Sequence, residues 1–148
     1  MSGQGSVATP GSAGFLMWRA TNAWQRAQRA ALDSVGLTHV QYALLATLAG
    51  DDARKGLSQA EISARSGVDP MTTSQVIRNL ADKGHVARST STEDKRAQRV
   101  VLTTTGRALA RKAQPKVEKA DNEFFSVAGK NLPALTSALA ALAGVEQA

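Results

Sequence analysis

Apolar residues recur every three or four positions over most of the chain, which is the spacing of the buried stripe on an amphipathic helix. The first such segment covers residues 15–32, and its stripe is made of Leu16, Ala20, Ala23, Ala27 and Ala31. A second helix is predicted to start at Thr38, because Gln41 stands three residues later in a capping-box pattern. It ends before Gly50, and its predicted buried residues are Val40, Leu44, Leu45 and Leu48.

Two shorter helices follow, joined by a turn that contains a glycine. Ser58 and Glu61 form a second capping-box pattern, which we expect to be the stronger of the two. Asp69 and Pro70 start the next helix, since Asp is a favoured N-cap and Pro is tolerated at the first helical position. That helix is predicted to end at about Lys83. Two short helices with a tight turn between them are typical of a helix-turn-helix.

The pattern then becomes extended. Residues 86–89 and 98–102 predict the two strands of a β-hairpin, with a polar tip at 90–97. A long helical pattern follows, and Pro115 within it predicts a bend because proline removes a backbone hydrogen bond. Asn131 is predicted to cap a last helix.

This order of elements predicts a mainly α fold with a small β-hairpin (α+β). We expect a disordered tail at 1–13 and a single domain at 14–148, with a winged helix-turn-helix lobe at about 38–103. The flanking helices, at about 14–34 and 104–145, carry more apolar surface than a small lobe can cover, which favours dimerisation through them. A compact monomer in which these helices pack on the lobe is the alternative.

Charge is the first property that points to a partner. The chain has 18 Lys and Arg against 12 Asp and Glu, a net charge of +6 and an isoelectric point near 10.2, as many nucleic-acid-binding proteins do. It has no cysteine, which excludes disulfides, thiolate metal sites and a cysteine-based redox switch. The two histidines, His39 and His85, lack a metal-ligand spacing, so we expect no metal and no cofactor. A metal sensor that uses histidine and carboxylate ligands is the alternative.

The helix starting at Pro70 has a predicted apolar back and a polar front. At 100° per residue, the back is formed by Thr73, Val76, Ile77 and Leu80. The front supplies the candidate DNA contacts of a recognition helix, which are Met71, Thr72, Ser74, Gln75, Arg78 and Asn79. Arginine can bond bidentately to guanine and glutamine to adenine. An ordinary solvated face is the alternative, but the preceding short helix and glycine turn favour a recognition helix.

The hairpin supplies a second set of candidate DNA contacts, namely Arg88, Asp94, Lys95, Arg96 and Arg99. Long cationic side chains at its tip can enter a minor groove, and Asp94 can hold a neighbouring arginine in position. A merely charged turn is the alternative.

Several segments together resemble the MarR family of winged helix-turn-helix transcriptional regulators. They are Leu-Ser-Gln-Ala-Glu-Ile at 57–62, Val-Ile-Arg-Asn-Leu at 76–80, Lys-Gly at 83–84, Thr-Glu-Asp-Lys-Arg at 92–96 and Val-Leu-Thr-Thr-Thr-Gly at 101–106. The resemblance covers roughly residues 14–143. It implies a homodimer that represses transcription from a palindromic operator, with Arg96 in the minor groove and Asp94 supporting it.

The same resemblance implies a ligand cleft between the dimer helices and the DNA-binding lobe. Four residues of the first two helices are candidates to line it for a small aromatic or amphipathic effector: Trp18, Trp24, His39 and Tyr42. An ordinary place in the protein core is the alternative for these side chains.

The function predicted from the sequence is therefore that of a sequence-specific, double-stranded DNA-binding transcriptional regulator, a ligand-responsive repressor acting as a homodimer. An architectural protein that binds DNA without sequence preference is the alternative. An enzyme is not expected, because the chain has no phosphate-binding glycine loop, HExxH or GxSxG motif. The start of the chain lacks the features of a signal peptide, so we expect a cytoplasmic protein that does not bind membranes.

Overall fold

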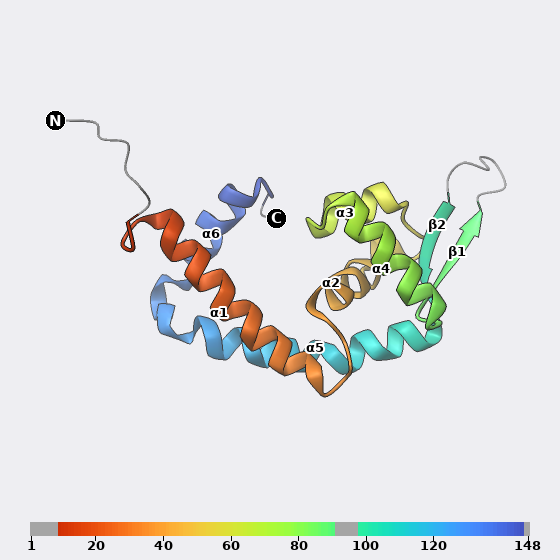
Figure 1. Ribbon diagram of the computed structural model, residues 1–148, viewed down its shortest axis with the longest axis horizontal. Coiled ribbons are helices and arrows are strands. Elements are labelled where there is room, and N and C mark those ends of the chain that lie inside the picture. The colour runs from red at the N-terminus through yellow and green to blue at the C-terminus, as the bar shows by residue number, and fades with distance from the viewer. Residues whose placement is uncertain (1–8, 91–97, 147–148) are drawn as a thin grey trace.

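The computed structural model describes residues 9–90 and 98–146 of the 148-residue chain. The fold is mainly helical with one antiparallel hairpin, which confirms the predicted fold class (Figure 1). Its elements are α1 (Ala13–Asp33), α2 (His39–Leu48), the 3-10 turn η1 (Asp51–Ala53), α3 (Gln59–Ser66), α4 (Pro70–Asp82), β1 (Val86–Thr90), β2 (Gln98–Leu102), α5 (Thr104–Phe125), η2 (Ser126–Asn131) and α6 (Leu132–Ala143). In these ranges no helix is both long and apolar enough to cross a membrane. Most of the tail expected at 1–13 lies outside the described residues.

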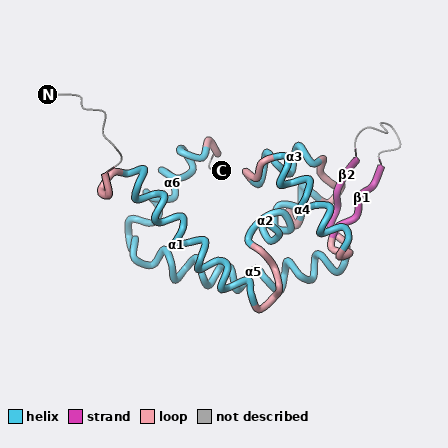
Figure 2. Tube along the Cα trace, viewed as in Figure 1, coloured by secondary structure: helices cyan, strands magenta, loops and turns pink. Residues whose placement is uncertain are grey.

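The helix α5 joins the two ends of the molecule. The lobe formed by α2, α3, α4 and the hairpin lies at one end of α5, and α6 lies at the other (Figures 1 and 2). The helix α1 packs along α5, and α2 contacts both of these helices. Pro115 lies inside α5, and the helix continues through it to Phe125.

One hydrophobic core holds the lobe together and extends onto α5. The largest fully buried apolar side chains of the lobe come from α2, α3, α4, β2 and the segment before α3. They are Leu44, Leu45, Leu48, Leu57, Ile62, Ile77, Leu80 and Val100. The core also includes Ala113 and Val117 of α5 and Leu32 of α1, which pack against the lobe. The lobe is therefore anchored to α5 by burial of apolar surface.

The capping box at the start of α2 is complete. Thr38 Oγ1 accepts from the Gln41 backbone N–H at 3.1 Å, and Gln41 Oε1 accepts from the Thr38 N–H at 2.9 Å. At the start of α3, Ser58 Oγ accepts from the Glu61 N–H at 3.1 Å, but the Glu61 carboxylate accepts from the Ser58 hydroxyl. The expectation that the second box is the stronger was wrong, because the Glu61 carboxylate accepts from the Ser58 hydroxyl and not from the Ser58 backbone N–H.

Two other local expectations were also wrong. Asn131 precedes α6, but its side chain makes no capping hydrogen bond. Its backbone is helical (φ −83°, ψ −5°), continuing from η2, whereas a capping residue needs an extended backbone to aim its side chain at the helix. On α2, Val40 is only half-buried and Gln41 is buried in its place, because the polar atoms of Gln41 find partners.

The hairpin pairs Val86 with Leu102 and runs to the pair of Thr90 and Gln98. A third segment joins it, since Leu57 and Val100 exchange backbone hydrogen bonds of 3.0 and 2.8 Å. This bridge ties the start of α3 to the hairpin, and the periodicity of the sequence did not predict it.

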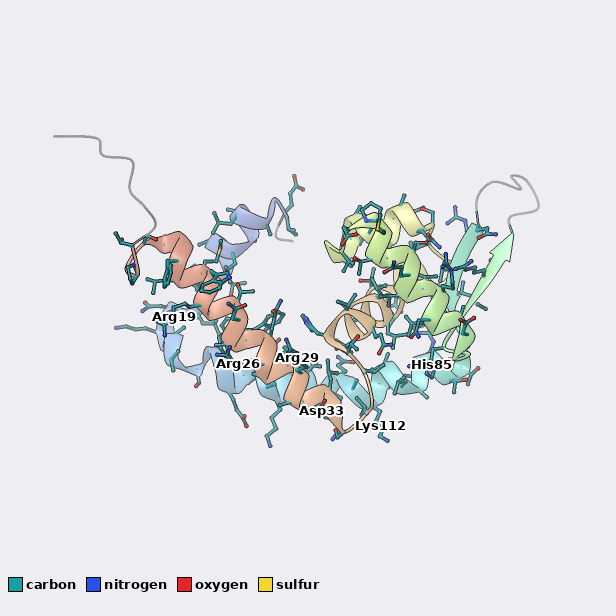
Figure 3. The ribbon with its side chains drawn as sticks, viewed as in Figure 1. Arg19, Arg26, Arg29, Asp33, His85 and Lys112 are labelled. Atoms are coloured by element: carbon teal, nitrogen blue, oxygen red, sulfur yellow. The ribbon has the colours of Figure 1, made fainter. Side chains whose placement is uncertain are left out.

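The base of the hairpin meets the start of α5 at a point where His85 lies (Figure 3). Thr103 Oγ1 accepts from the Gly106 N–H at 3.1 Å and donates to the Gly84 carbonyl at 2.6 Å, while the Thr103 N–H donates to the His85 carbonyl. A Cβ atom on Gly106 would lie 1.9 Å from the carbonyl oxygen of His85. Only glycine therefore fits where the helix presses on the hairpin.

Candidate nucleic-acid interface

The helix α4 begins at a well-formed cap. Asp69 Oδ1 accepts from the Thr72 N–H at 2.8 Å, and Pro70 occupies the first turn as predicted. Hydrogen bonds from Thr72 hold the pKa of the Asp69 carboxyl below its usual value. The cap therefore remains ionised at neutral pH and fixes where the helix starts.

The back of α4 is buried as predicted. Thr73, Ile77 and Leu80 are fully buried, and Val76 packs against the core. The Thr73 hydroxyl donates to the Val68 carbonyl at 3.3 Å, and the Ser63 hydroxyl donates to the same oxygen at 2.5 Å. These two bonds join α3, the turn and α4 into a rigid helix-turn-helix.

The front of α4 faces solvent. Met71 is 74% exposed, and Gln75, Arg78 and Asn79 are exposed as well. The other two predicted contacts, Thr72 and Ser74, are half-buried. Asn79 is not independent of the lobe, because its Oδ1 accepts from Gln41 Nε2 of α2 at 2.8 Å. Four of the six predicted contact residues are therefore exposed on the front of α4, and the other two are half-buried at its sides.

The hairpin places two of the predicted wing residues on paired strands. Arg88 of β1 and Arg99 of β2 are exposed. One guanidinium N–H of Arg99 donates to the Gly56 carbonyl at 3.0 Å, so this arginine also holds the segment before α3. The three predicted tip residues, Asp94, Lys95 and Arg96, lie outside the described residues.

Three of the four predicted pocket residues surround one carboxylate. The Trp24 ring meets the His39 ring edge-on, with centroids 4.8 Å apart, and Trp24 Nε1 donates to Asp121 Oδ1 at 2.8 Å. Asp121 also accepts from Gln28 Nε2 at 2.6 Å and acts electrostatically on His39 and Tyr42. The cluster joins α1, α2 and α5. The fourth residue, Trp18, is 61% exposed and pairs with Phe15 towards the start of α1.

Burial decides the protonation of this cluster. It lowers the pKa of His39, and Arg29 adds to the lowering while Asp121 opposes it. It raises the pKa of Tyr42, and the carboxylates of Glu118 and Asp121 raise it further. His39 is therefore neutral and Tyr42 keeps its proton at neutral pH.

A separate groove of about 660 Å³ runs between α1 and α5. It is lined by Ala27, Ala30, Ala31, Ser34, Lys116, Lys119, Ala120, Glu123 and Phe124. This lining does not include Trp24, His39 or Tyr42. The groove and the aromatic cluster are thus distinct features of the same helix pair.

A helix with a buried back and an exposed polar front, followed by a hairpin with exposed arginines, is the architecture of a winged helix-turn-helix. The family model of the MarR family matches residues 37–97. The HTH-type transcriptional regulator YdcH of Bacillus subtilis is 39% identical over 120 residues, which cover 80% of this chain and 82% of YdcH. This chain belongs to the MarR family.

Two further relatives extend the match. A MarR-family transcriptional regulator from Rhodococcus sp. RHA1 superposes with a TM-score of 0.80 at 27% identity, covering 93% of this chain and 96% of that one. The repressor Rv2887 of Mycobacterium tuberculosis is 36% identical over 108 residues, 73% of this chain and 76% of its own. Its structure in complex with salicylic acid superposes with a TM-score of 0.66, covering 86% of this chain and 93% of that one. This MarR-family protein is a DNA-binding transcriptional regulator.

The sequence did not indicate two residues of the regulator's aromatic cluster. Gln28 is fully buried, and its Oε1 has no hydrogen-bond partner among the residues that the structure describes. Its position one turn after Trp24 in an apolar stripe was an available signal, because a polar residue there must find a partner. Asp121 lies in a polar stretch of α5, and nothing near it in the sequence distinguishes it from its exposed neighbours.

Proposed function

We propose that this MarR-family regulator is a homodimeric, ligand-responsive repressor of a palindromic operator, acting by binding rather than by catalysis. In this proposal α4 enters the major groove and the hairpin contacts the flanking minor groove. The observation that carries it is the split of α4 into a buried back, with Ile77 and Leu80 at 0% exposure, and a front with exposed Met71, Gln75 and Arg78.

The proposed DNA contacts keep the residues predicted from the sequence. On the recognition helix they are Met71, Thr72, Ser74, Gln75, Arg78 and Asn79. On the hairpin they are Arg88 and Arg99, together with Asp94, Lys95 and Arg96 of the tip. The exposure of Arg88 and Arg99 supports this assignment, since cations on the wing can neutralise phosphates.

Exposed apolar side chains at the end of the molecule away from the hairpin support the homodimer. On α1, Leu16 is 51%, Met17 53% and Trp18 61% exposed, and on α6 Leu139 and Leu142 are 40% and 76% exposed. Apolar surface gathered in this way usually marks an interface. A two-fold dimer would bury it and set two recognition helices at a fixed spacing.

The aromatic cluster is the proposed effector site, with Trp24, His39 and Tyr42 as its lining and Trp18 lying apart from it. Gln28 Oε1 is a buried acceptor that has no hydrogen-bond partner within residues 9–90 and 98–146, and a ligand hydroxyl could donate to it. The complex of the relative Rv2887 with salicylic acid supports a small aromatic acid as the class of effector. Such a ligand would act by favouring one spacing of the two lobes over another.

The first test is binding to duplex DNA from upstream of the regulator's own gene, against a scrambled duplex, at two salt concentrations. We expect a dimer footprint and a preference of about 10³-fold or more for the operator, with weak and strongly salt-dependent binding to the scramble. Equal affinity for both duplexes would favour an architectural protein, and no binding to either would contradict the proposal. Adding salicylate should then release the operator if the effector class is correct.

A further inference from the structure

Two hydrogen bonds in series connect the start of α2 with the surface of α4. The Thr38 backbone N–H donates to Gln41 Oε1 at 2.9 Å, and Gln41 Nε2 donates to Asn79 Oδ1 at 2.8 Å. Gln41 is only 9% exposed, whereas Asn79 lies exposed on the recognition helix. The buried amide of Gln41 thus links a helix cap to a residue at the proposed DNA interface.

The direction of this series is fixed by its first member. A backbone N–H can only donate, so the atom of Gln41 that faces Thr38 must be the oxygen. The nitrogen of Gln41 must then face Asn79, and the atom of Asn79 that faces Gln41 must be its oxygen. The Nδ2 amino group of Asn79 is therefore left to point away from Gln41.

This orientation limits what Asn79 can offer to DNA. An asparagine that recognises adenine uses its oxygen and its nitrogen together on one base. Here the oxygen is directed at Gln41, so the outward group is a hydrogen-bond donor. Donors fit the acceptors of DNA, which are phosphate oxygens and the acceptor atoms of base edges such as guanine O6 and N7.

The cap alone does not explain a glutamine at position 41. Glutamate or glutamine completes a capping box equally well, because only a side-chain oxygen is needed. Among the described residues, the side-chain nitrogen of Gln41 has one hydrogen-bond partner, which is Asn79 Oδ1. The amide is required for the link and not for the cap.

We propose that Gln41 is a specificity-determining positioning residue, which holds Asn79 with its amide nitrogen outward so that Asn79 donates to an acceptor on the operator. The inference rests on the proposed function, since it assumes that α4 faces operator DNA. It adds a buried residue of α2 to those that set DNA preference.

The test compares Gln41→Glu with Thr38→Asp. Both variants add one negative charge at the start of α2, Thr38→Asp at the N-cap and Gln41→Glu in the first turn. Both keep a competent cap, because aspartate is a favoured N-cap and glutamate completes a capping box. Only Gln41→Glu removes the donor to Asn79 and forces the Asn79 amide to turn its oxygen outward. We expect operator affinity about tenfold lower for Gln41→Glu than for Thr38→Asp, as for the loss of a hydrogen bond with its partner left unsatisfied.

The duplex used distinguishes the two sources of the acceptor. A loss confined to the operator, with a changed base preference at one position of each half-site, assigns a base edge. An equal loss on operator and scrambled duplex assigns a phosphate, which carries no sequence information, and would overturn the assignment of Gln41 as specificity-determining. Equal affinity and base preference for the two variants would overturn the inference while leaving the proposed function intact. A wild-type protein that fails to discriminate the operator would overturn both.

A measurement on the wild-type protein covers the case in which Gln41→Glu does not fold. The side-chain amide protons of Gln41 should exchange slowly with solvent by NMR, and Asn79→Ala should abolish this protection. The Asn79 side-chain amide protons should shift when operator is added. Fast exchange at Gln41, or no response at Asn79, would overturn the inference.

Discussion

The lobe and the terminal arm of this protein are built from similar helices, yet they bury their apolar residues to very different extents. In the lobe, α2 alone contributes three leucines at 1% exposure or less. In the arm, which we define as residues 13–20 of α1 together with 126–146, no residue is buried, and the whole of it lies in the described part of the chain. The lobe thus has a hydrophobic core of its own, whereas the apolar side chains of the arm are not covered within the protomer.

This difference separates two sources of stability. The lobe is held by contacts within the protomer, so its fold depends on the chain itself. The arm exposes Leu132, Leu139, Leu142 and Val145 on or just after α6, and such a surface is stabilised only when something covers it. Substitutions in the lobe should therefore change unfolding, whereas substitutions in the arm should change assembly.

The largest effect is expected for Leu139→Asp combined with Leu142→Asp in the arm. Each buried leucine contributes about 1.5–3 kcal/mol, and a two-fold interface counts each substitution twice. The dimer dissociation constant should rise by more than about 10³-fold, measured by sedimentation, while the lobe stays folded by circular dichroism. The control Ala60→Asp with Ala64→Asp adds the same charge to the exposed side of α3 and should leave the dimer intact. An unchanged sedimentation coefficient for the arm variant would contradict the division.

The second prediction concerns the lobe core. Ile77→Ala should lower the free energy of unfolding by about 3 kcal/mol, because Ile77 is fully buried and truncation leaves a cavity. Urea denaturation measures this value. Met71→Ala on the outer side of the same helix, where the side chain is 74% exposed, should change it by less than about 0.5 kcal/mol. Similar losses for both variants would mean that α4 is not divided into a back and a front.

The third prediction compares one arginine of the lobe with one of α1. Arg78→Ala should weaken operator binding by about 1–3 kcal/mol and relax base preference, as expected for a residue that contacts a base. Arg26→Ala removes the same charge from α1, where Arg26 lies among the labelled side chains of Figure 3, and should change affinity little. Fluorescence anisotropy with operator and scrambled duplexes measures both. An equal loss for the two variants would indicate a general charge effect.

The smallest effect is a dependence on pH at the junction between the two regions. The pKa of His39 is lowered from 6.5 by burial, so the unfolded chain binds this proton more readily than the folded one. Stability contributed by neutral His39 is therefore full above pH 6.5 and decreases as pH falls below it. Thermal melts of wild type and His39→Gln between pH 7.5 and 5.5 should show a shallower pH dependence in the variant. Parallel curves would contradict the assignment to His39.

Local features of this fold were predictable because neighbouring residues determine them. Asp69 and Pro70 predicted the start of α4, and the extended segments at 86–89 and 98–102 predicted both strands nearly to the residue. The division of α4 into a back and a front also follows from helical periodicity alone. These are properties that a short window of sequence contains.

What escaped prediction depends on partners that are distant in the sequence. Gln28 and Asp121 are 93 residues apart, and Gln41 and Asn79 are 38 apart. A buried polar side chain is tolerated when it finds a partner, and the sequence around Gln41 does not show that Asn79 is one. The same argument explains why Gln41 and not Val40 is buried, and why the four aromatic candidates separate into a cluster of three and an exposed Trp18.

The contact between Gly106 and His85 has a consequence for how the molecule can move. No side chain fits between the first turn of α5 and the base of the hairpin, and Thr103 is hydrogen-bonded to Gly84 and His85 across the same contact. A movement of the first turn of α5 would therefore carry the base of the hairpin with it.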